Sequence, residues 1–106
     1  MIKLKNIFEF IPEDLEEEYV EKLVESKNIK IERIVSHGHK SPNDFWYDQK
    51  QNEFVILIQG YAELLFEDGT RVKMGKGDYL NIPAHAKHRV EFTDPNEHTY
   101  WIAVFY

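Results

Sequence analysis

The 106-residue chain contains no cysteine, and this absence excludes a disulfide framework, a thiolate metal site and a cysteine nucleophile. Long apolar runs are also missing, because the longest one, residues 100–106, is far too short to span a bilayer. The first residues lack the apolar stretch and the small-residue cleavage site of a secretory signal. We therefore expect a soluble, cytoplasmic protein without a membrane partner.

Clustered positive charge is the next feature that the chain lacks. The formal net charge is −6 and the sequence pI is about 5.3, whereas nucleic acids and anionic membranes are bound by clustered Lys and Arg side chains. The sequence also has no glycine-rich phosphate loop and no serine nucleophile elbow, so nucleotide binding and covalent acyl chemistry have no support. A nucleic-acid partner is not expected, and a small neutral or cationic partner remains open.

The chain does contain enough apolar material for one hydrophobic core. Hydrophobic residues make up 42% of the sequence and aromatic residues 14%, which suffices for a single domain without disulfides. We expect residues 1–28 to form an extension that packs on the main body, and residues 29–106 to form that body.

Residues near the N-terminus follow the spacing of a helix. Pro12 precedes acidic residues, as in the first turn of a helix, and Leu15, Tyr19 and Leu23 form an apolar stripe four residues apart. This pattern predicts one short helix that ends near residues 26–28. Its acidic residues are expected to form a solvated face: Glu16, Glu17, Glu18, Glu21 and Glu25.

The rest of the chain alternates between short apolar runs and turn signals. Asp68-Gly69 is typical of a tight hairpin, and Pro83 and Pro95 interrupt later runs. Short strands at this spacing, with no helices between them, predict an all-β antiparallel sandwich or barrel. The expected strands cover residues 54–58, 61–67, 72–74, 79–82, 88–93 and 99–106.

A pair of histidines precedes these strands. Ile29 and Ile31 share a parity with His37 and His39, so an extended chain would direct both imidazoles to the interior face. Imidazole and carboxylate groups are the ligands that a divalent transition metal takes when it keeps positions open for chemistry. The predicted metal ligands are His37, His39, Glu53 and His88.

The spacing of these residues resembles the two sequence motifs of the cupin superfamily. The resemblance covers residues 31–92 and implies a jelly-roll barrel, or double-stranded β-helix, here preceded by the short helix. It also implies that the four metal ligands meet inside the barrel. The matching residues are His37, His39, Glu53 and Gly60 in the first motif, and Gly77, Pro83 and His88 in the second.

Three positions depart from the family pattern. Ile31 and His85 stand where the motifs have glycine, and Phe92 stands where the second motif has asparagine. His85 lies in a turn three residues before His88, and we interpret it as a proton relay at the mouth of the site. An alternative metal ligand, a rim residue and a solvated loop residue remain open as its role.

The spacer between His39 and Glu53 is the larger departure, because it has thirteen residues where the family usually has three or four. Residues 41–51 are therefore an insertion, and it carries Trp46 and Tyr47, which we expect to contact substrate. A lid over the barrel mouth, a dimer contact and a satellite core cluster are all compatible with these aromatic residues.

The resemblance implies a small metal-dependent cupin that holds one Fe, Mn, Ni or Zn ion and acts on a small organic molecule. Ligand type does not choose among these metals. Iron would suit a dioxygenase, and zinc or manganese would suit isomerase, lyase or hydrolytic chemistry. The alternatives are a non-catalytic module that binds or senses a sugar or metabolite, and a structural dimer with a vestigial site.

A homodimer is expected as well. Residues 100–106 are apolar on both parities, and the outward set needs a covering sheet, a helix or a second subunit. The resemblance points the same way, because cupins commonly associate in pairs.

Overall fold

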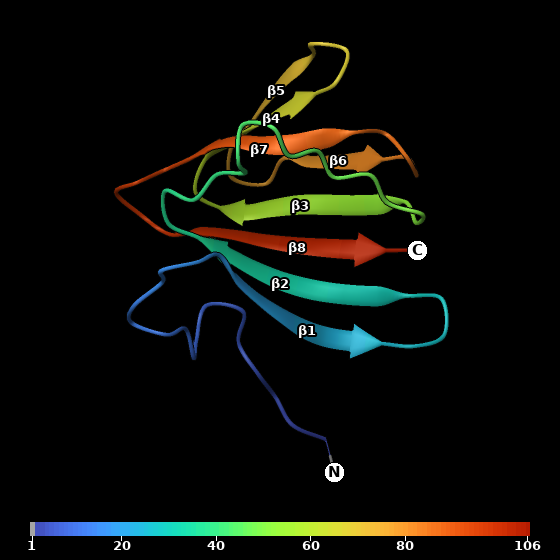
Figure 1. Ribbon diagram of the computed structural model, residues 1–106. Helices are drawn as coiled ribbons and strands as arrows, with labels where there is room; N and C mark the ends of the chain where they lie inside the picture. The colour runs from blue at the N-terminus through green and yellow to red at the C-terminus, as the bar shows by residue number, and fades with distance from the viewer. Residues whose placement is uncertain (1) are drawn as a thin grey trace.

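The computed structural model describes residues 2–106 and is built from eight strands in two antiparallel sheets (Figure 1). The all-β expectation is confirmed. The strands are β1 (Tyr19–Glu25), β2 (Lys30–Ser36), β3 (Glu53–Gln59), β4 (Ala62–Phe66), β5 (Arg71–Met74), β6 (Tyr79–Ile82), β7 (His88–Thr93) and β8 (Thr99–Phe105).

The larger sheet has the strand order β1-β2-β8-β3-β6, and the smaller sheet has the order β5-β4-β7. Strand β8, the last in the chain, lies in the middle of the larger sheet, between β2 and β3 (Figure 1). Consecutive strands such as β2 and β3, or β7 and β8, are thus not paired with each other, which is typical of chains that cross between two packed sheets. The side chains that meet between the sheets form the core: Val55, Leu57, Ala62, Leu64, Met74, Ile82, Trp101 and Ala103.

The predicted N-terminal helix is wrong, because residues 2–106 contain no helix. Tyr19–Glu25 is strand β1, and it pairs antiparallel with β2 from Tyr19 opposite Val35 to Glu25 opposite Lys30. The residues taken for the helix end form the hairpin turn, where Ser26 N–H donates to the Ile29 carbonyl over 2.8 Å. Pairing with β2 supplies the backbone partners of this segment, and this outweighs a weak local helical preference.

Gly60 is placed where the chain leaves β3 and passes close to the start of β8. Its φ is +106°, and a Cβ added there would lie 2.6 Å from Cα of Thr99 and 2.5 Å from its Oγ1. A side chain at this position is therefore excluded by both backbone conformation and space.

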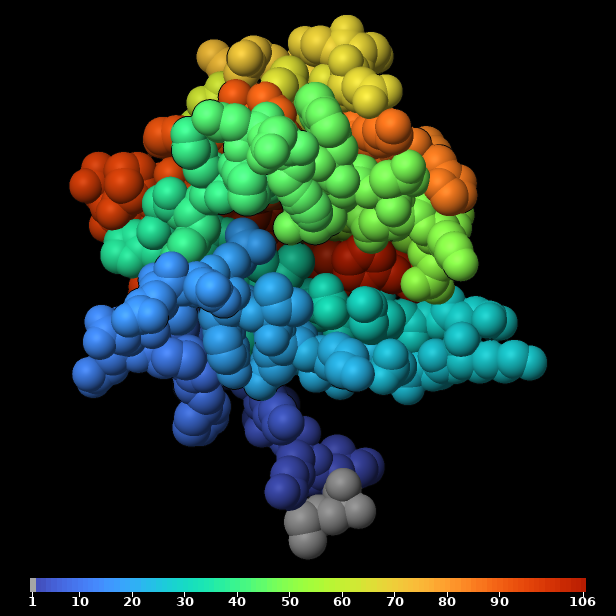
Figure 2. Space-filling model, in the orientation of Figure 1, coloured from blue at the N-terminus to red at the C-terminus, as the bar shows by residue number. Residues whose placement is uncertain are grey.

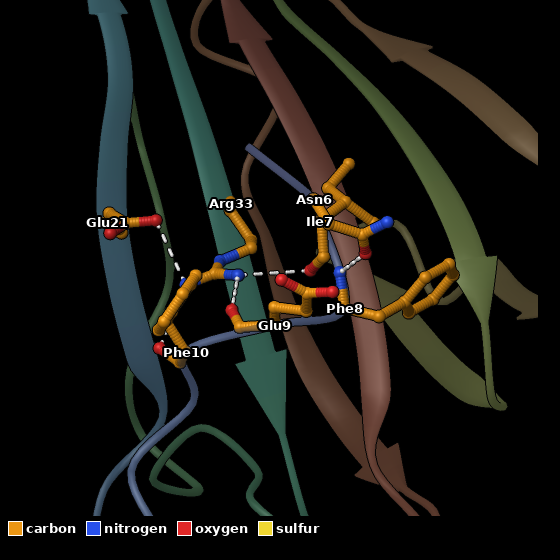
Figure 3. Close-up of polar contacts among 7 residues, drawn as sticks. All are labelled: Asn6, Ile7, Phe8, Glu9, Phe10, Glu21 and Arg33. Carbon is orange, nitrogen blue, oxygen red and sulfur yellow. Dashed lines mark hydrogen bonds and ion pairs between the residues drawn. The ribbon is translucent and has the colours of Figure 1, made fainter. Parts of the chain in front are cut away.

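Strand β2 is covered on both faces. Its odd-numbered residues Arg33 and Val35 are buried on the outer face of the sheet, under a segment we call the N-terminal strap (residues 6–10). The Arg33 guanidinium donates to the carbonyl oxygens of Ile7 at 3.0 Å and Glu9 at 2.6 Å, and it pairs with Glu21 at 3.0 Å (Figure 3). The strap thus makes the outer face of β2 as buried as the inner face.

Candidate functional site

A cavity of about 210 Å³ lies between the inner face of the larger sheet and strands β4 and β7. In the space-filling view a hollow opens between β2 and the insertion, with atoms of β8 at its floor (Figure 2). An engineered cavity of about 150 Å³ holds benzene, so this volume suits a small organic molecule. The lining residues are Glu18, Val20, Glu32, Ile34, Tyr47, Gln49, Glu53, Val55, Leu64, Ile82, His88, Val90, Trp101 and Phe105.

The even-numbered residues of β2 face this cavity. Glu32 and Ile34 line it, and Ile34 lies opposite Trp101 of β8 in the register of the sheet. The sequence interpretation placed the interior on the odd parity, with Ile29 and Ile31. It was misled because the N-terminal strap buries the odd face as well, so hydrophobicity along β2 does not mark the interior side.

Glu53 and His88 form an ion pair inside the cavity. Glu53 begins β3 and His88 begins β7, both side chains are largely buried, and His88 Nε2 lies 3.5 Å from Glu53 Oε1. Gln49 of the insertion donates to the same carboxylate oxygen over 3.0 Å. The structure therefore brings together two of the four residues that the sequence nominated as metal ligands.

The protonation of His88 follows from its neighbours. Its Nδ1 lies 2.8 Å from the Ala86 carbonyl oxygen, which only accepts, so Nδ1 carries hydrogen and Nε2 faces Glu53. Burial lowers the pKa of His88, but the hydrogen bonds to Glu53 and Ala86 and the charge of Glu53 together raise it above its ordinary value. Glu53 thus favours the protonated form of the His88 imidazole beside it.

Tyr47 brings the insertion to the cavity. Its backbone forms a two-way bridge with His88, with N···O distances of 2.7 and 3.2 Å, and its ring stacks on the imidazole at 5.6 Å between centroids. The phenol lines the cavity, and burial together with the charges of Glu18 and Glu53 raises its pKa, so it remains a neutral hydrogen-bond donor. The insertion therefore lies beside the site that it was expected to cover.

Trp46 takes a different position. The guanidinium of Arg89 lies over its ring at 4.6 Å, and Trp46 is not among the cavity-lining residues within the described part of the chain. Neighbouring aromatic residues in this insertion thus face different surroundings, since extended residues alternate in direction.

Glu18 is a cavity residue that the sequence interpretation missed. It precedes β1, and its carboxylate accepts a 2.5 Å hydrogen bond from Ser36 Oγ, which in turn accepts one from Trp101 Nε1 over 3.2 Å. Burial raises the pKa of Glu18, and the Ser36 hydrogen bond opposes this only in part. Its parity with Val20 would have identified it, once residues 19–25 were recognised as a strand.

His37 and His39 follow the end of β2 and are not among the residues that line the cavity. The two ring nitrogens of His39 contact backbone groups, with Nδ1 accepting from His37 N–H at 2.9 Å and Nε2 lying 3.0 Å from the Leu15 carbonyl. His37 is exposed and packs its ring against His98 at 4.8 Å between centroids. Both histidines have structural neighbours in place of the predicted metal.

The residues present do not fit the predicted four-ligand metal site. Across residues 2–106, no three His, Asp or Glu side chains are grouped so that they could hold one ion. Glu53 and His88 face each other, and the other two nominated ligands are engaged elsewhere.

His85 lies on the surface near the turn into β7. Its φ is +64°, and its Nδ1 pairs with Asp48 of the insertion at 2.8 Å, while the side chain is 66% exposed. His85 stands where the family motif has glycine, and it adopts a left-handed conformation. His85 fastens the insertion to the turn, and its predicted role as a proton relay stays a prediction.

The comparisons with known proteins agree with this architecture. The family model described as "Cupin domain" matches residues 32–105. The chain therefore belongs to the cupin family, as the motif spacing indicated. Among curated proteins no sequence matches this chain, and no helix in the described residues is long and apolar enough to cross a membrane.

Similar solved structures were found as well. The crystal structure of "a putative mannose-6-phosphate isomerase" from Ralstonia eutropha JMP134 is 42% identical, with a TM-score of 0.93, and covers 98% of this chain and 97% of its own. The EutQ protein of Clostridium difficile is 20% identical, with a TM-score of 0.67 and coverage of 84% and 67%. A cupin superfamily protein of Desulfitobacterium hafniense DCB-2 is 16% identical, with a TM-score of 0.73 and coverage of 90% and 82%. The latter two show the shared fold alone.

Proposed function

We propose that this protein binds a small carbonyl compound in the cavity and transfers a proton on it, as an isomerase does. The observation that carries this proposal is the buried Glu53–His88 pair, which faces the cavity. Acid–base catalysis needs one group that accepts a proton and one that donates a proton. A carboxylate can accept one, and a protonated imidazole can donate one. The name of the Ralstonia protein is compatible with this reaction type.

The residues divide the reaction between them. Glu53 takes a proton from the carbon next to the carbonyl, and His88 Nε2–H gives one to the carbonyl oxygen, which produces a neutral enol. When the carbon next to the carbonyl carries a hydroxyl group, Glu53 gives its proton to the former carbonyl carbon and His88 takes the proton of that hydroxyl, which becomes the new carbonyl and yields the isomer. Gln49 keeps the Glu53 carboxylate oriented, and Tyr47 covers the imidazole and narrows access of water.

Proton exchange with solvent tests the proposal. The protein is incubated in D₂O with hydroxyacetone, mannose or mannose 6-phosphate, and the loss of the C–H signals next to the carbonyl is followed by NMR. We expect exchange above the buffer rate with at least one compound, and its loss in both Glu53→Gln and His88→Gln. His98→Ala is the matched control, because this histidine lies outside the cavity lining and packs against His37.

Binding without turnover is the outcome that would contradict the catalytic part. A compound that perturbs the indole signal of Trp101 at the cavity, yet never exchanges its protons, would identify a binding module. Exchange that persists in both variants would show that Glu53 and His88 are not the reacting groups.

Metal binding, a homodimer and a cytoplasmic location stay predictions. Elemental analysis of protein purified without a histidine tag tests the first, with Glu53 and His88 as the two cavity donors. Light scattering at micromolar concentration tests the second, and a monomer would contradict it.

A further inference from the structure

The charged side chains that line the cavity are mostly negative. Carboxylates of Glu18, Glu32 and Glu53 line it, and in the described chain no lysine or arginine is among the lining residues. His88 is the cationic group that faces them, and it is paired with Glu53. An anionic ligand would therefore meet like charge in a site with little water to screen it.

Two of the three carboxylates already have partners. Glu32 pairs with Lys30 at 3.5 Å, and Glu53 is held by His88 and Gln49. Glu18 differs, because its hydrogen bond comes from the neutral Ser36 hydroxyl and no ion pair reaches it among residues 2–106. The charge of His39 acts on Glu18 without a direct hydrogen bond or ion pair between them, so this half-buried carboxylate is costly in the empty site.

An indole lies next to this carboxylate. Trp101 and Glu18 share the Ser36 hydroxyl, so the ring and the carboxylate are linked at one end of the cavity. The face of an indole attracts cations, and ammonium groups are held by aromatic rings together with carboxylates. Trp101 directs its Nε1–H edge to Ser36 and also lines the cavity, so Glu18 is the charged partner and the indole an aromatic neighbour of a positive group bound there.

The remaining walls argue against a ligand with hydroxyls on every carbon. Leu64, Ile82 and Val90 face the cavity with other aliphatic side chains, and they offer no hydrogen-bond partner. A sugar would leave several hydroxyl groups unsatisfied against these walls. A ligand with an apolar body and one polar, charged head matches the lining better.

We propose that the ligand of this cavity is a small organic cation, namely a carbonyl compound with an apolar body and one protonated amine, whose ammonium group is held by Glu18 beside Trp101. This inference rests on the proposed function, in that it names the chemical class of the compound bound beside Glu53 and His88. Of the compounds in the exchange test, it predicts that hydroxyacetone is turned over and that mannose and mannose 6-phosphate, the sugar phosphate in the name of the Ralstonia protein, are not.

Three compounds of nearly equal shape and different charge test whether the cavity selects a cation. Benzylamine, benzyl alcohol and benzoate are titrated into the full-length protein, and the indole N–H signals are followed by ¹H–¹⁵N NMR. The chain has two tryptophans, so Trp101 reports on the cavity and Trp46, which lies outside its lining, serves as an internal control. We expect benzylamine to move the Trp101 signal with an affinity at least about tenfold above benzyl alcohol, and benzoate to leave it unmoved.

A matched pair of variants assigns the effect to one carboxylate. Glu18→Gln keeps an acceptor for Ser36 and removes the charge, and it should weaken benzylamine about tenfold while benzyl alcohol binds as before. Glu17→Gln removes the adjacent charge, which lies outside the lining of this cavity, and should change neither affinity. Thermal unfolding of each variant confirms that it remains folded.

Specific results would overturn the inference. Equal binding of amine and alcohol, or tighter binding of benzoate, would show that the site does not select a cation, and the proposed function would stand if exchange activity were present. An equal loss in Glu18→Gln and Glu17→Gln would mean that only general surface charge is felt. If no probe of any charge moves Trp101 and no carbonyl compound exchanges protons, the proposed function fails as well.

Discussion

The two faces of β2 bury charge in different ways. On the outer face, Arg33 is surrounded by carbonyl oxygens of the N-terminal strap and by Glu21 (Figure 3). On the inner face, Glu32 and its neighbour Glu18 border an open cavity. A buried charge whose partners come from the same chain stabilises the fold, whereas one that faces a cavity is available for a ligand.

Arg33 and Glu18 differ in their burial and in their hydrogen-bond partners. Arg33 is 3% exposed, and Nε is its one buried atom without a hydrogen bond in residues 2–106. Glu18 is half-buried and has a hydroxyl as its donor. The outer face is thus a closed structural contact, and the inner face is a site that a ligand would complete.

The largest expected effect tests the outer face. Arg33→Ala removes the donors that hold the strap and leaves its carbonyls without partners, so the free energy of unfolding should fall by about 3 kcal/mol. Urea denaturation measures this change. Glu21→Gln is the control, and because this partner is 38% exposed it should cost only about 0.5 kcal/mol. If Arg33→Ala lowers the free energy of unfolding by less than about 1 kcal/mol, the outer face of β2 is not the structural contact described above.

The pH dependence of stability tests the Glu53–His88 pair. The pKa of His88 is raised in the folded state, so its contribution is fully present below the unfolded value of about 6.5 and is lost as the pH rises through the folded pKa. The unfolding free energy of the wild type should therefore decline above pH 6.5. Glu53→Gln should flatten this decline, and NMR titration of His88 in the variant should show a lower pKa. Superimposable pH profiles would contradict the pairing.

Substitution of Glu18 is expected to raise the free energy of unfolding slightly, whereas substitution of Arg33 lowers it. Its folded pKa is raised above 4.5, so its contribution to stability is lost as the pH rises through that pKa, and the ionised group is unfavourable at neutral pH. Glu18→Gln should therefore stabilise the ligand-free protein by about 0.5 kcal/mol at pH 7, even though it weakens ligand binding. Chemical denaturation checks this, and a clear destabilisation would place Glu18 among the structural charges with Arg33.

The smallest effect is expected at the surface, at His85. His85→Gly relieves a left-handed conformation at φ +64° but removes the exposed pair with Asp48, so the net change in stability should be near zero. His85→Ala keeps the strain and loses the pair, and should cost about 0.5 kcal/mol. Neither variant should move the Trp101 indole signal. A shift of that signal would extend the site to this turn.

The strands from β3 onward were predictable from the chain alone. Asp68-Gly69 does form a tight turn, with Gly69 at φ +93° and Thr70 N–H donating to Asp68 at 2.9 Å. Apolar runs bounded by such turns leave little choice of secondary structure, and β7 (His88–Thr93) begins and ends where it was expected. The N-terminal helix failed because Leu15, Tyr19 and Leu23 satisfy a helical period by chance while β1 obtains its partners from β2.

The candidate site was predictable in part. Glu53 and His88 could be nominated from their spacing, and they do meet. His37 and His39 share a parity with Val35, whose face is covered by the strap, and no local pattern reports that cover. Glu18 was not predicted as a site residue because the expected helix would expose it to solvent. In the structure it shares the parity of Val20 and faces the cavity.

The sequence by itself determined the all-β class and the positions of most turns, because these depend on local periodicity and on glycine and proline geometry, and its motif spacing indicated the cupin family by resemblance. The tertiary structure alone decided which face of β2 is the interior and which charges border the cavity. Those outcomes depend on what covers each face, and the covering segments, the strap and the insertion, are remote in the sequence from the residues that they contact. Burial of a charge is therefore a property of the assembled layers, whereas strand and turn preferences are properties of neighbouring residues.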